Sequence, residues 1–426
     1  MNSEHNPTMN RRHALSRLAF GAALLSEPAR EILAQTAALP SAELLRRAPE
    51  TYWTLLRREQ FLLPDDRLFL NNGSLGVTPR PVLRAMTDYL ERAAALEMDD
   101  APRWGYETLD TEREEMAEFL GCRKDELAFT HNCTEAMCAI ANGLDLEPGD
   151  EILLTNQEHA GGTMCWRVQE KRRGIRVRLV EIPVTPRDPG EIADRLISAI
   201  GPRTRVLSFS GITTTTGLVL PVKQLCSAAR EKRVISVVDG AHMNGQIPVN
   251  LRDLGCDYFA GSPHKWMFAP AGCGFLYGRD GALDRLWPSI VSSRWDDKEQ
   301  LKAARFMMVG TNNRAIFDGM MAGVRFLKQL GPENIYARLQ QLASLAIRLA
   351  KQRSYLEVVS SDDPRFYQAM AKIRFKTESV QPVLDALKKN QIVFLGGREI
   401  RLSAHVHTRP GDLEKFFALC DRALGA

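Results

Sequence analysis

The chain has 426 residues, a length that suggests two domains or one large domain carrying a smaller one. Hydrophobic residues make up 44% and charged residues 25%, close to an average globular protein, which excludes a collagen, a coiled coil or a disordered chain. The net charge of +4 is too small to indicate a nucleic-acid-binding protein. No run of about eighteen apolar residues occurs, so no membrane span is predicted. The eight cysteines form no C-x-x-C pair, which argues against a disulfide scaffold or a zinc ribbon.

The first 40 residues differ in kind from the rest. Arg11 and Arg12 precede the apolar stretch 18–25, which resembles a twin-arginine export signal. Charged residues close to this stretch and the lack of a clear A-x-A cleavage site count against an export signal, and an amphipathic helix packed on the body is the alternative. The twin-arginine pattern remains slightly favoured. We therefore expect a periplasmic protein, with a cytoplasmic one as the alternative, and treat residues 1–40 as a separate segment.

From residue 68 onward, short apolar runs alternate with amphipathic stretches of helix length. Runs such as 234–238 are apolar at nearly every position, as expected of strands buried on both faces. The repetition of strand, helix and strand predicts an α/β fold with a mostly parallel sheet. The predicted strands are 68–72, 126–130, 151–155, 176–182, 205–210, 234–239, 258–261 and 274–277. The predicted helices lie at about 80–97, 107–120, 134–143, 160–173, 189–200 and 221–232.

The pattern changes after about residue 283, and an exposed loop is predicted at 294–305. The elements expected beyond it are helices at 312–330 and 332–353, strands at 356–361, 370–376 and 399–405, and a last helix at 410–424. The sequence therefore predicts a large domain over 41–310 and a small C-terminal α+β domain over 311–426.

Polar residues follow several predicted strands, and in open parallel sheets ligands bind at the carboxyl ends of the strands. Thr134 opens a helix whose free backbone amides suit a phosphate, although Thr134 could also simply cap that helix. His159 could stack on an aromatic ligand or be structural. Asp239 ends an apolar strand, where a carboxylate needs a cationic partner such as a protonated ring nitrogen, unless it caps a helix or forms a salt bridge.

A lysine in an unusual setting follows the strand predicted at 258–261. Lys265 lies between Pro263 and Trp266, with glycines after them, and a lysine in a tight apolar turn can act as a nucleophilic amine. A Schiff-base lysine, an aspartate for a pyridinium nitrogen, a ring-stacking group and a phosphate cradle together indicate a pyridoxal 5'-phosphate (PLP) site. Asp239 precedes Lys265 by 26 positions, which is one strand–loop–strand step and predicts neighbouring strands.

Short motifs follow one another in a specific order, namely Leu70–Gly76, Asn132–Ala136, Glu158–Ala160, Val238–His242, Pro263–Trp266, Gly310–Asn312 and Arg401–Ser403. In this order and spacing they resemble the class V aminotransferase-fold PLP-dependent enzymes, in the isopenicillin N epimerase-like branch that is related to cysteine desulfurases. The resemblance runs from about Leu68 to the C-terminus. It implies the PLP-dependent transferase type I fold, with a large domain and a small C-terminal α+β domain.

The resemblance implies a role for each matching residue. Lys265 forms the Schiff base, Asp239 pairs with the pyridine nitrogen, and His159 stacks on the ring. His242 packs beside the ring. The residues implied at the phosphate are Thr134, Glu135, Ser262 and His264. Thr311 reaches the phosphate of a neighbouring subunit, because family members build each site across a two-fold homodimer. Arg401 binds the α-carboxylate of an amino-acid substrate, while Asn71 and Asn72 either touch the substrate or form a turn.

The assignment of Arg401 also has support from the residues themselves. Arg401, Ser403, His405 and His407 have one parity on a predicted strand and therefore share a face. A guanidinium offers the planar two-point contact that a carboxylate needs. The two histidines could alternatively bind a metal, but they lack a third ligand nearby, and we predict no metal site.

The resemblance implies chemistry at Cα through an external aldimine, with Lys265 transferring the proton. Epimerisation, transamination and β-elimination by a lyase remain open. Epimerisation needs an acid on the opposite face, for which His242, His405 and Tyr367 are candidates. A cysteine desulfurase is disfavoured because residues 360–365 contain no cysteine. The alternatives of another class are a catalytically silent binding protein of this fold and a nucleotide-binding sheet. The first would be expected to lack Lys265 or Asp239, and both are present. The second would need a G-x-G-x-x-G turn after the first strand, which residues 72–76 do not match.

Overall fold

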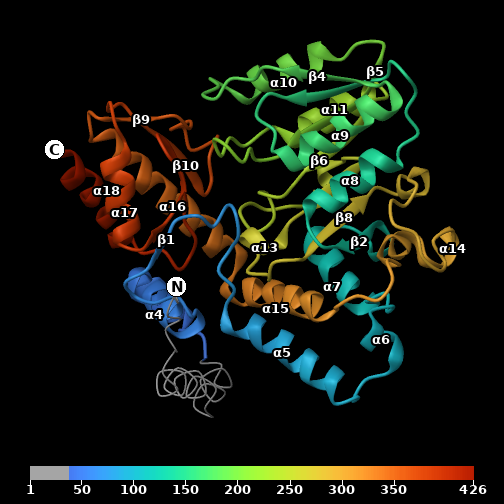
Figure 1. Ribbon diagram of the computed structural model, residues 1–426, viewed down its shortest axis with the longest axis horizontal. Coiled ribbons are helices and arrows are strands. Elements are labelled where there is room, and N and C mark those ends of the chain that lie inside the picture. The colour runs from blue at the N-terminus through green and yellow to red at the C-terminus, as the bar shows by residue number, and fades with distance from the viewer. Residues whose placement is uncertain (1–37) are drawn as a thin grey trace, which may run out of the picture. The chain divides into compact units, whose positions relative to one another are not determined.

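The computed structural model describes residues 38–426, so the twin-arginine pattern lies outside the described residues. Residues Pro40–Ala426 form one compact unit that contains a seven-stranded and a four-stranded sheet. The strands of the larger sheet appear in teal, green and yellow in Figure 1, and the elements of the smaller sheet in dark orange and red. In the described part of the chain, no helix has both the length and the apolar character needed to cross a membrane.

The larger sheet has the strand order β2-β8-β7-β6-β5-β3-β4. Its members are β2 (Leu127–Thr130), β3 (Glu151–Thr155), β4 (Arg176–Val180), β5 (Thr204–Ser210), β6 (Ile235–Asp239), β7 (Tyr258–Gly261) and β8 (Gly274–Gly278). The strands from β7 to β4 pair in parallel, whereas β8 is antiparallel to both of its neighbours. Most side chains of these strands are buried, since helices cover both faces, and the predicted mostly parallel α/β fold is confirmed.

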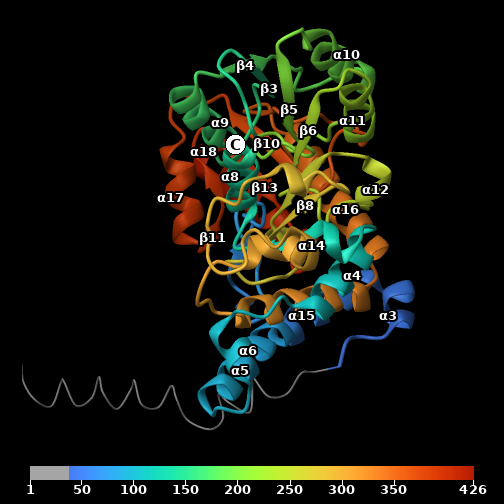
Figure 2. The same cartoon turned by 90° about the vertical axis from the view of Figure 1, so that its right-hand side faces the viewer.

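Strands β3, β5 and β6 run in Figure 2 between two groups of helices. On one side lie α8 (Cys133–Gly143) and α9 (Ala160–Arg173), and on the other α10 (Pro189–Ala199) and α11 (Val222–Glu231). Further helices are α5 (Arg80–Ala94), α6 (Asp100–Trp104), α7 (Asp110–Leu120), α12 (Leu251–Leu254), α13 (Pro263–Trp266) and α15 (Ala315–Leu330). Helix α15 packs along α5 at the bottom of Figure 1.

The smaller sheet is antiparallel and has the order β12-β13-β10-β9. Its strands are β9 (Leu356–Val358), β10 (Met370–Phe375), β12 (Leu395–Gly396) and β13 (Glu399–Ser403), and its helices are α16 (Pro332–Lys351), α17 (Gln381–Lys389) and α18 (Pro410–Leu424). Strand β1 (Leu68–Phe69) pairs with β11 (Ile392–Val393), and Leu68 and Leu70 lie in the apolar core of these C-terminal elements. The first predicted strand therefore joins the C-terminal part of the chain and not the larger sheet.

The prediction of an exposed loop over 294–305 is wrong in its second half. Helix α14 (Lys298–Leu301) and a 3-10 helix over Lys302–Met307 occupy it, and Ala303, Ala304 and Arg305 are buried. The apolar residues that follow the charged run at 296–299 provide the buried face.

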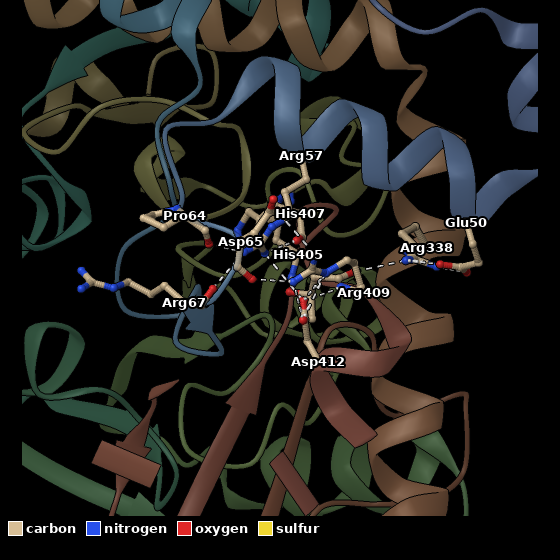
Figure 3. A network of polar contacts seen from close by, with 11 residues as sticks. Glu50, Arg57, Pro64, Asp65, Arg67, Arg338, His405, His407, Arg409 and Asp412 are labelled. Atoms are coloured by element: carbon tan, nitrogen blue, oxygen red, sulfur yellow. Dashed lines mark hydrogen bonds and ion pairs between the residues drawn. The ribbon is translucent and has the colours of Figure 1, made fainter. Parts of the chain in front are cut away.

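An N-terminal helix holds the turn that follows β13, as Figure 3 shows. Helix α4 (Pro49–Gln60), which follows α3 (Ala42–Arg47), carries the buried Arg57. Its guanidinium donates to the carbonyl oxygens of His407 at 2.7 Å and of Pro64 and Arg67 at 2.8 Å. Arg338 of α16 binds the carboxylate of Glu50 at 2.5 and 2.9 Å, and it donates to the carbonyl of Thr408 at 3.1 Å.

We expect Arg57→Met to lower the free energy of unfolding by about 2–4 kcal/mol, because it leaves the buried His407 carbonyl oxygen without this donor and removes two further hydrogen bonds. Arg58→Met on the same helix is the control, since the Arg58 side chain is 64% exposed and should cost about 0.5 kcal/mol or less. Urea denaturation of both variants measures the difference. Equal effects would show that the buried hydrogen bonds of Arg57 do not stabilise the fold.

Candidate functional site

A cavity of about 540 Å³ opens between the carboxyl ends of the larger sheet and one face of the smaller sheet. The predicted site residues that line it are Thr134, His159, Asp239, His242, Ser262, His264, Lys265 and Arg401. Asn72, Glu135 and Thr311 are not among the lining residues. Within residues 38–426 no group of three or more side chains could hold a metal ion.

Strand register brings the ends of three strands together beneath this cavity. Asp239 at the end of β6 is paired with Ser210 of β5 on one side and with Ala260 of β7 on the other. Strand β7 leads into α13, which carries Lys265. The predicted neighbouring strands for Asp239 and Lys265 are therefore present.

The backbone around Lys265 is held by the loop that follows β1. Asn72 Nδ2 donates to the Lys265 carbonyl at 2.6 Å, and the Gly76 amide donates to the His264 carbonyl at 2.8 Å. A Cβ at position 76 would lie 2.5 Å from the Lys265 oxygen, so only glycine permits this approach. Asn72 thus supports the backbone of the lysine and does not line the cavity, and contact with a substrate stays a prediction.

The Lys265 amine faces a buried histidine. Its Nζ lies 3.0 Å from His242 Nε2, while the Trp266 indole donates to His242 Nδ1 at 3.2 Å. Burial lowers the pKa of Lys265, although the nearby Asp239 opposes this shift. Burial also lowers the pKa of His242 well below its usual value, and the charge of Lys265 adds to the effect. Both shifts are toward the uncharged form of each group.

Asp239 offers one free carboxylate oxygen to the cavity. Its Oδ1 accepts from the Ala241 amide at 3.0 Å and from the Cys133 thiol at 3.2 Å. Its Oδ2 has no hydrogen-bond partner among residues 38–426, although the residue is only 6% exposed. A carboxylate oxygen that faces the cavity from a largely buried residue is placed to accept from a donor or pair with a cation of a ligand.

The N-terminus of α8 lies at another part of the cavity wall. The Cys133 amide donates to Ser262 Oγ at 3.1 Å, and the Glu135 amide donates to Asn132 Oδ1 at 2.9 Å. Thr134 between them is exposed and, in the described chain, neither its amide nor its hydroxyl is paired. This end suits an anion.

The Glu135 side chain does not line the cavity and binds His131 instead, while the predicted place of this residue beside the phosphate stays a prediction. Its Oε2 accepts from the backbone amide of His131 and lies at the same 2.7 Å from the ring nitrogen Nδ1 of that residue. Hydrogen bonds from His131 lower the pKa of Glu135, against the effect of burial. A carboxylate would also repel a phosphate at this position.

His159 caps α9 at the cavity wall. Its Nδ1 accepts from the Gly161 amide at 3.0 Å, so the neutral ring carries its proton on Nε2. Burial and then the charge of Lys265 lower the pKa of His159. A neutral imidazole of this kind is suited to stack on an aromatic ring.

Arg401 lines the cavity from β13 as a buried cation. Its Nη1 donates to the carbonyl and the hydroxyl of Thr214, both at 2.9 Å, and its Nη2 donates to Ser74 Oγ at 2.9 Å and to Asn71 Oδ1 at 3.2 Å. Its Nε is buried without a partner in the described residues. Burial alone lowers the pKa of Arg401 to about 10. A two-point contact with a carboxylate therefore requires Ser74, Asn71 or Thr214 to give way.

Several predicted residues lie away from the cavity. Strand β13 ends at Ser403, so the shared parity does not extend to His405 and His407, which pack as buried rings. His405 Nε2 donates to the Trp266 carbonyl at 3.2 Å, and the Tyr367 hydroxyl is hydrogen-bonded to Ser344. Neither residue lines the cavity as an acid for substrate.

Thr311 lies on a separate surface pocket beside Trp104 and Tyr106, outside the cavity of its own chain. The Asn312 amide donates to the Trp104 carbonyl at 3.0 Å and fixes this loop. A Cβ at Gly105 would lie 2.2 Å from the Asn312 oxygen, so the loop packs closely on the end of α6.

Sequence reasoning missed two groups near the site. Thr214 binds Arg401 and also lies 3.1 Å from His242 Nε2. Glu158 accepts from Thr155 Oγ1 at 2.5 Å and from Ser210 Oγ at 2.6 Å, and burial raises its pKa to about 7. Both follow strands of the larger sheet, so the strand-end rule, applied to every strand, would have singled them out.

The kinds of group that line this cavity fit PLP. Asp239 Oδ2 is free for a ring nitrogen, and Thr134 is free for a phosphate. A Cβ at Gly161 would lie 2.5 Å from Thr134 Oγ1, and one at Gly162 would lie 3.1 Å from Asp239 Oδ2. The two glycines thus keep open the space between the phosphate end and the ring-nitrogen end.

The raised pKa of Glu158 predicts a dependence of stability on pH. Between its ordinary value of 4.5 and about 7, the folded chain holds a proton that the unfolded chain has released. The stability that this bound proton contributes is complete below pH 4.5 and is lost as the pH rises through about 7. The wild-type free energy of unfolding should therefore fall by at most about 3 kcal/mol over this range because of Glu158, and this fall should be absent in Glu158→Gln.

The free energy of unfolding of wild type and Glu158→Gln, measured across this pH range, tests the expectation. Glu118→Gln on the exposed face of α7 is the control and should follow the wild-type curve. If the free energy of unfolding of Glu158→Gln falls with pH in parallel with wild type, the expectation is wrong.

Comparisons with known proteins agree with this site. A family model described as aminotransferase class-V matches residues 68–410. The chain is 34% identical over 330 residues to isopenicillin N epimerase of Streptomyces clavuligerus, covering 74% of this chain and 83% of that protein. It is 31% identical over 304 residues to a cysteine desulfurase of Haloferax volcanii, covering 66% and 68% of the two chains.

Among solved structures, a mutant of the cystine C-S lyase C-DES with glycine covalently linked to its PLP cofactor gives a TM-score of 0.78 at 24% identity. That comparison covers 85% of this chain and 99% of the other, and it supports the fold. The chain belongs to the class-V aminotransferase family, and its cofactor is pyridoxal 5'-phosphate.

Proposed function

We propose that the protein is an amino-acid epimerase of the isopenicillin N epimerase-like kind, which breaks and re-forms the Cα–H bond of an α-amino acid. The observation that carries the proposal is the shared cavity in which Lys265, Asp239 and Arg401 face the same space. The 34% and 35% identity to two isopenicillin N epimerases supports it.

PLP, when bound, supplies an electron sink that stabilises the negative charge left on Cα. Asp239 Oδ2 holds the ring nitrogen protonated, which that sink requires. Arg401 fixes the substrate carboxylate and so orients the Cα–H bond toward Lys265 Nζ. Lys265, whose pKa burial lowers, would take the Cα proton and return it.

The cysteines argue against sulfur transfer. A desulfurase needs a thiolate that reaches the substrate, whereas each of the eight cysteines is buried or partly buried. Cys133, which lines the cavity, donates its thiol proton to Asp239, and burial raises its pKa well above the ordinary value. A thiol in this state is a poor nucleophile.

Lys265 is also the best candidate to move the proton on both faces. Of the three residues considered as a second acid, only His242 lines the cavity, and it lies on the side of Lys265 at 3.0 Å. We therefore expect one base, and not two, to serve the reaction.

Incubation of the holoenzyme with single amino acids in deuterated water tests the function. We expect deuterium at Cα in both enantiomers, without net keto acid, and no exchange in Lys265→Ala. With a Cα-deuterated substrate in light water, one base should return part of the label to the product. A stoichiometric keto acid would identify an aminotransferase, and release of the β-substituent would identify a lyase. The absence of Cα exchange with every amino acid would overturn the proposal.

Arg401→Lys should lower kcat/KM by about tenfold or more while the visible spectrum of the cofactor stays unchanged, because an ammonium cannot make the planar two-point contact. Arg398→Lys is the matched control, since Arg398 is exposed just before the same strand and donates to the carbonyls of Thr377 and Glu378. Loss of PLP from Arg401→Lys would instead place Arg401 at the cofactor.

We also propose a homodimer in which Thr311 serves the site of the partner subunit. Support comes from its position outside its own cavity and from the exposed apolar residues Trp104, Ile290 and Val291. Lys265→Ala and Thr311→Glu, each expected to be inactive, should regain activity after mixing and subunit exchange, because hybrid dimers contain one intact site. Hybrids that form but stay inactive would contradict shared sites.

A further inference from the structure

A chain of hydrogen bonds joins a buried indole to the Lys265 amine. Trp266 is fully buried and donates from Nε1 to His242 Nδ1 at 3.2 Å. The other ring nitrogen of His242, Nε2, lies 3.0 Å from Lys265 Nζ and 3.1 Å from Thr214 Oγ1. The three residues Trp266, His242 and Lys265 thus form a relay that ends in the cavity.

The indole decides which nitrogen of His242 carries the proton. An indole N–H only donates, so His242 Nδ1 must accept and the proton of the neutral ring lies on Nε2. Burial keeps this ring neutral by lowering its pKa well below the usual value. An ammonium also only donates, so a charged Lys265 would place its N–H groups against the Nε2–H group. A free amine instead accepts the Nε2–H bond.

We propose that Trp266 acts through His242 to hold Lys265 as a free amine, ready to capture the cofactor. This inference rests on the PLP site described above. In the capture step the amine nitrogen forms a C=N bond to the aldehyde carbon of PLP. The aldehyde oxygen leaves as water together with both amine protons. Trp266 is therefore a positioning residue, since it touches neither substrate nor cofactor.

The relay is one of several influences on the protonation of Lys265. The titratable or charged groups around the amine are Asp239 of β6, Cys133 of α8, Arg401 of β13, His159 at the start of α9, His242 after β6, and His264 of α13 itself. Asp239 favours the charged amine, whereas burial and Arg401 favour the free one. Removal of the relay should therefore move the balance toward the ammonium.

His405 fixes the Trp266 indole in place. The Val406 amide donates to His405 Nδ1 at 2.8 Å, so His405 Nε2 carries the proton and donates to the Trp266 carbonyl at 3.2 Å. The Trp266 and His405 rings are stacked with centroids 5.8 Å apart. Trp266 consequently cannot turn its N–H away without breaking this packing.

Competitive acetylation of Lys265, followed by peptide mass analysis, tests the inference on the full-length chain after removal of PLP. We expect Trp266→Phe, which keeps a buried ring but loses the N–H, to raise the pH midpoint of Lys265 labelling by about 0.5–1 unit. Trp166→Phe is the matched control. Trp166 is equally buried and donates to Ser208 Oγ at 3.2 Å, outside the cavity. The pH midpoint of Lys265 labelling in Trp166→Phe should therefore equal that of wild type.

A double variant separates the relay from general packing. His242→Leu should raise the midpoint by itself, and Trp266→Phe should add nothing in that background, because the effect passes through His242. A wild-type midpoint in Trp266→Phe, an equal shift in Trp166→Phe, or additive shifts would overturn the proposal.

A measurement on the wild-type chain covers the case in which Trp266→Phe does not fold. Nitrogen-15 labelling of the histidines, with the His242 signal assigned by its loss in His242→Leu, reports which ring nitrogen carries hydrogen. We expect the proton on Nε2, and a proton on Nδ1 would overturn the relay.

Discussion

Three consecutive carbonyl oxygens at the end of α13 hold the reactive lysine in place. The carbonyls of His264, Lys265 and Trp266 accept from Gly76, Asn72 and His405, which come from far apart in the chain. A helix of four residues leaves its last carbonyls without partners of its own, so other segments must supply the donors. The lysine side chain can be poised only because this backbone is fixed.

Much of the fold could be predicted because its signals are local. The strands of the larger sheet are apolar runs bounded by polar residues, and the residues after them, such as Asp239 and His159, follow from that pattern. The periodicity of 410–424 likewise matches α18. The short helices, including α6 and α12, carry too few residues for a periodic signal and were not predicted.

The remaining features depend on contacts between distant residues, which a sequence pattern does not contain. The side chain of the motif residue Glu135 turns to His131, because two nitrogen atoms of His131 are within hydrogen-bond reach. Asn72 donates to the Lys265 backbone, a contact that only folding creates because the two residues lie far apart in the chain. The apolar β1 looks like a sheet strand, yet its partner β11 lies more than 300 positions later.

The attachment of the N-terminal helix has a mechanical consequence. The Arg57 and Arg338 bonds and the β1–β11 pairing tie residues 49–70 to the elements that carry Arg401. If the smaller sheet rotates toward the larger one when substrate binds, this early segment must travel with it as part of the same rigid body. The chain crosses between the two bodies just after Asn71, in the loop whose Asn72 and Gly76 grip the α13 backbone. The same segment would then serve as the hinge of the closure and as the support of the lysine. A change in the conformation of this loop would therefore alter both the closure and the position of Lys265.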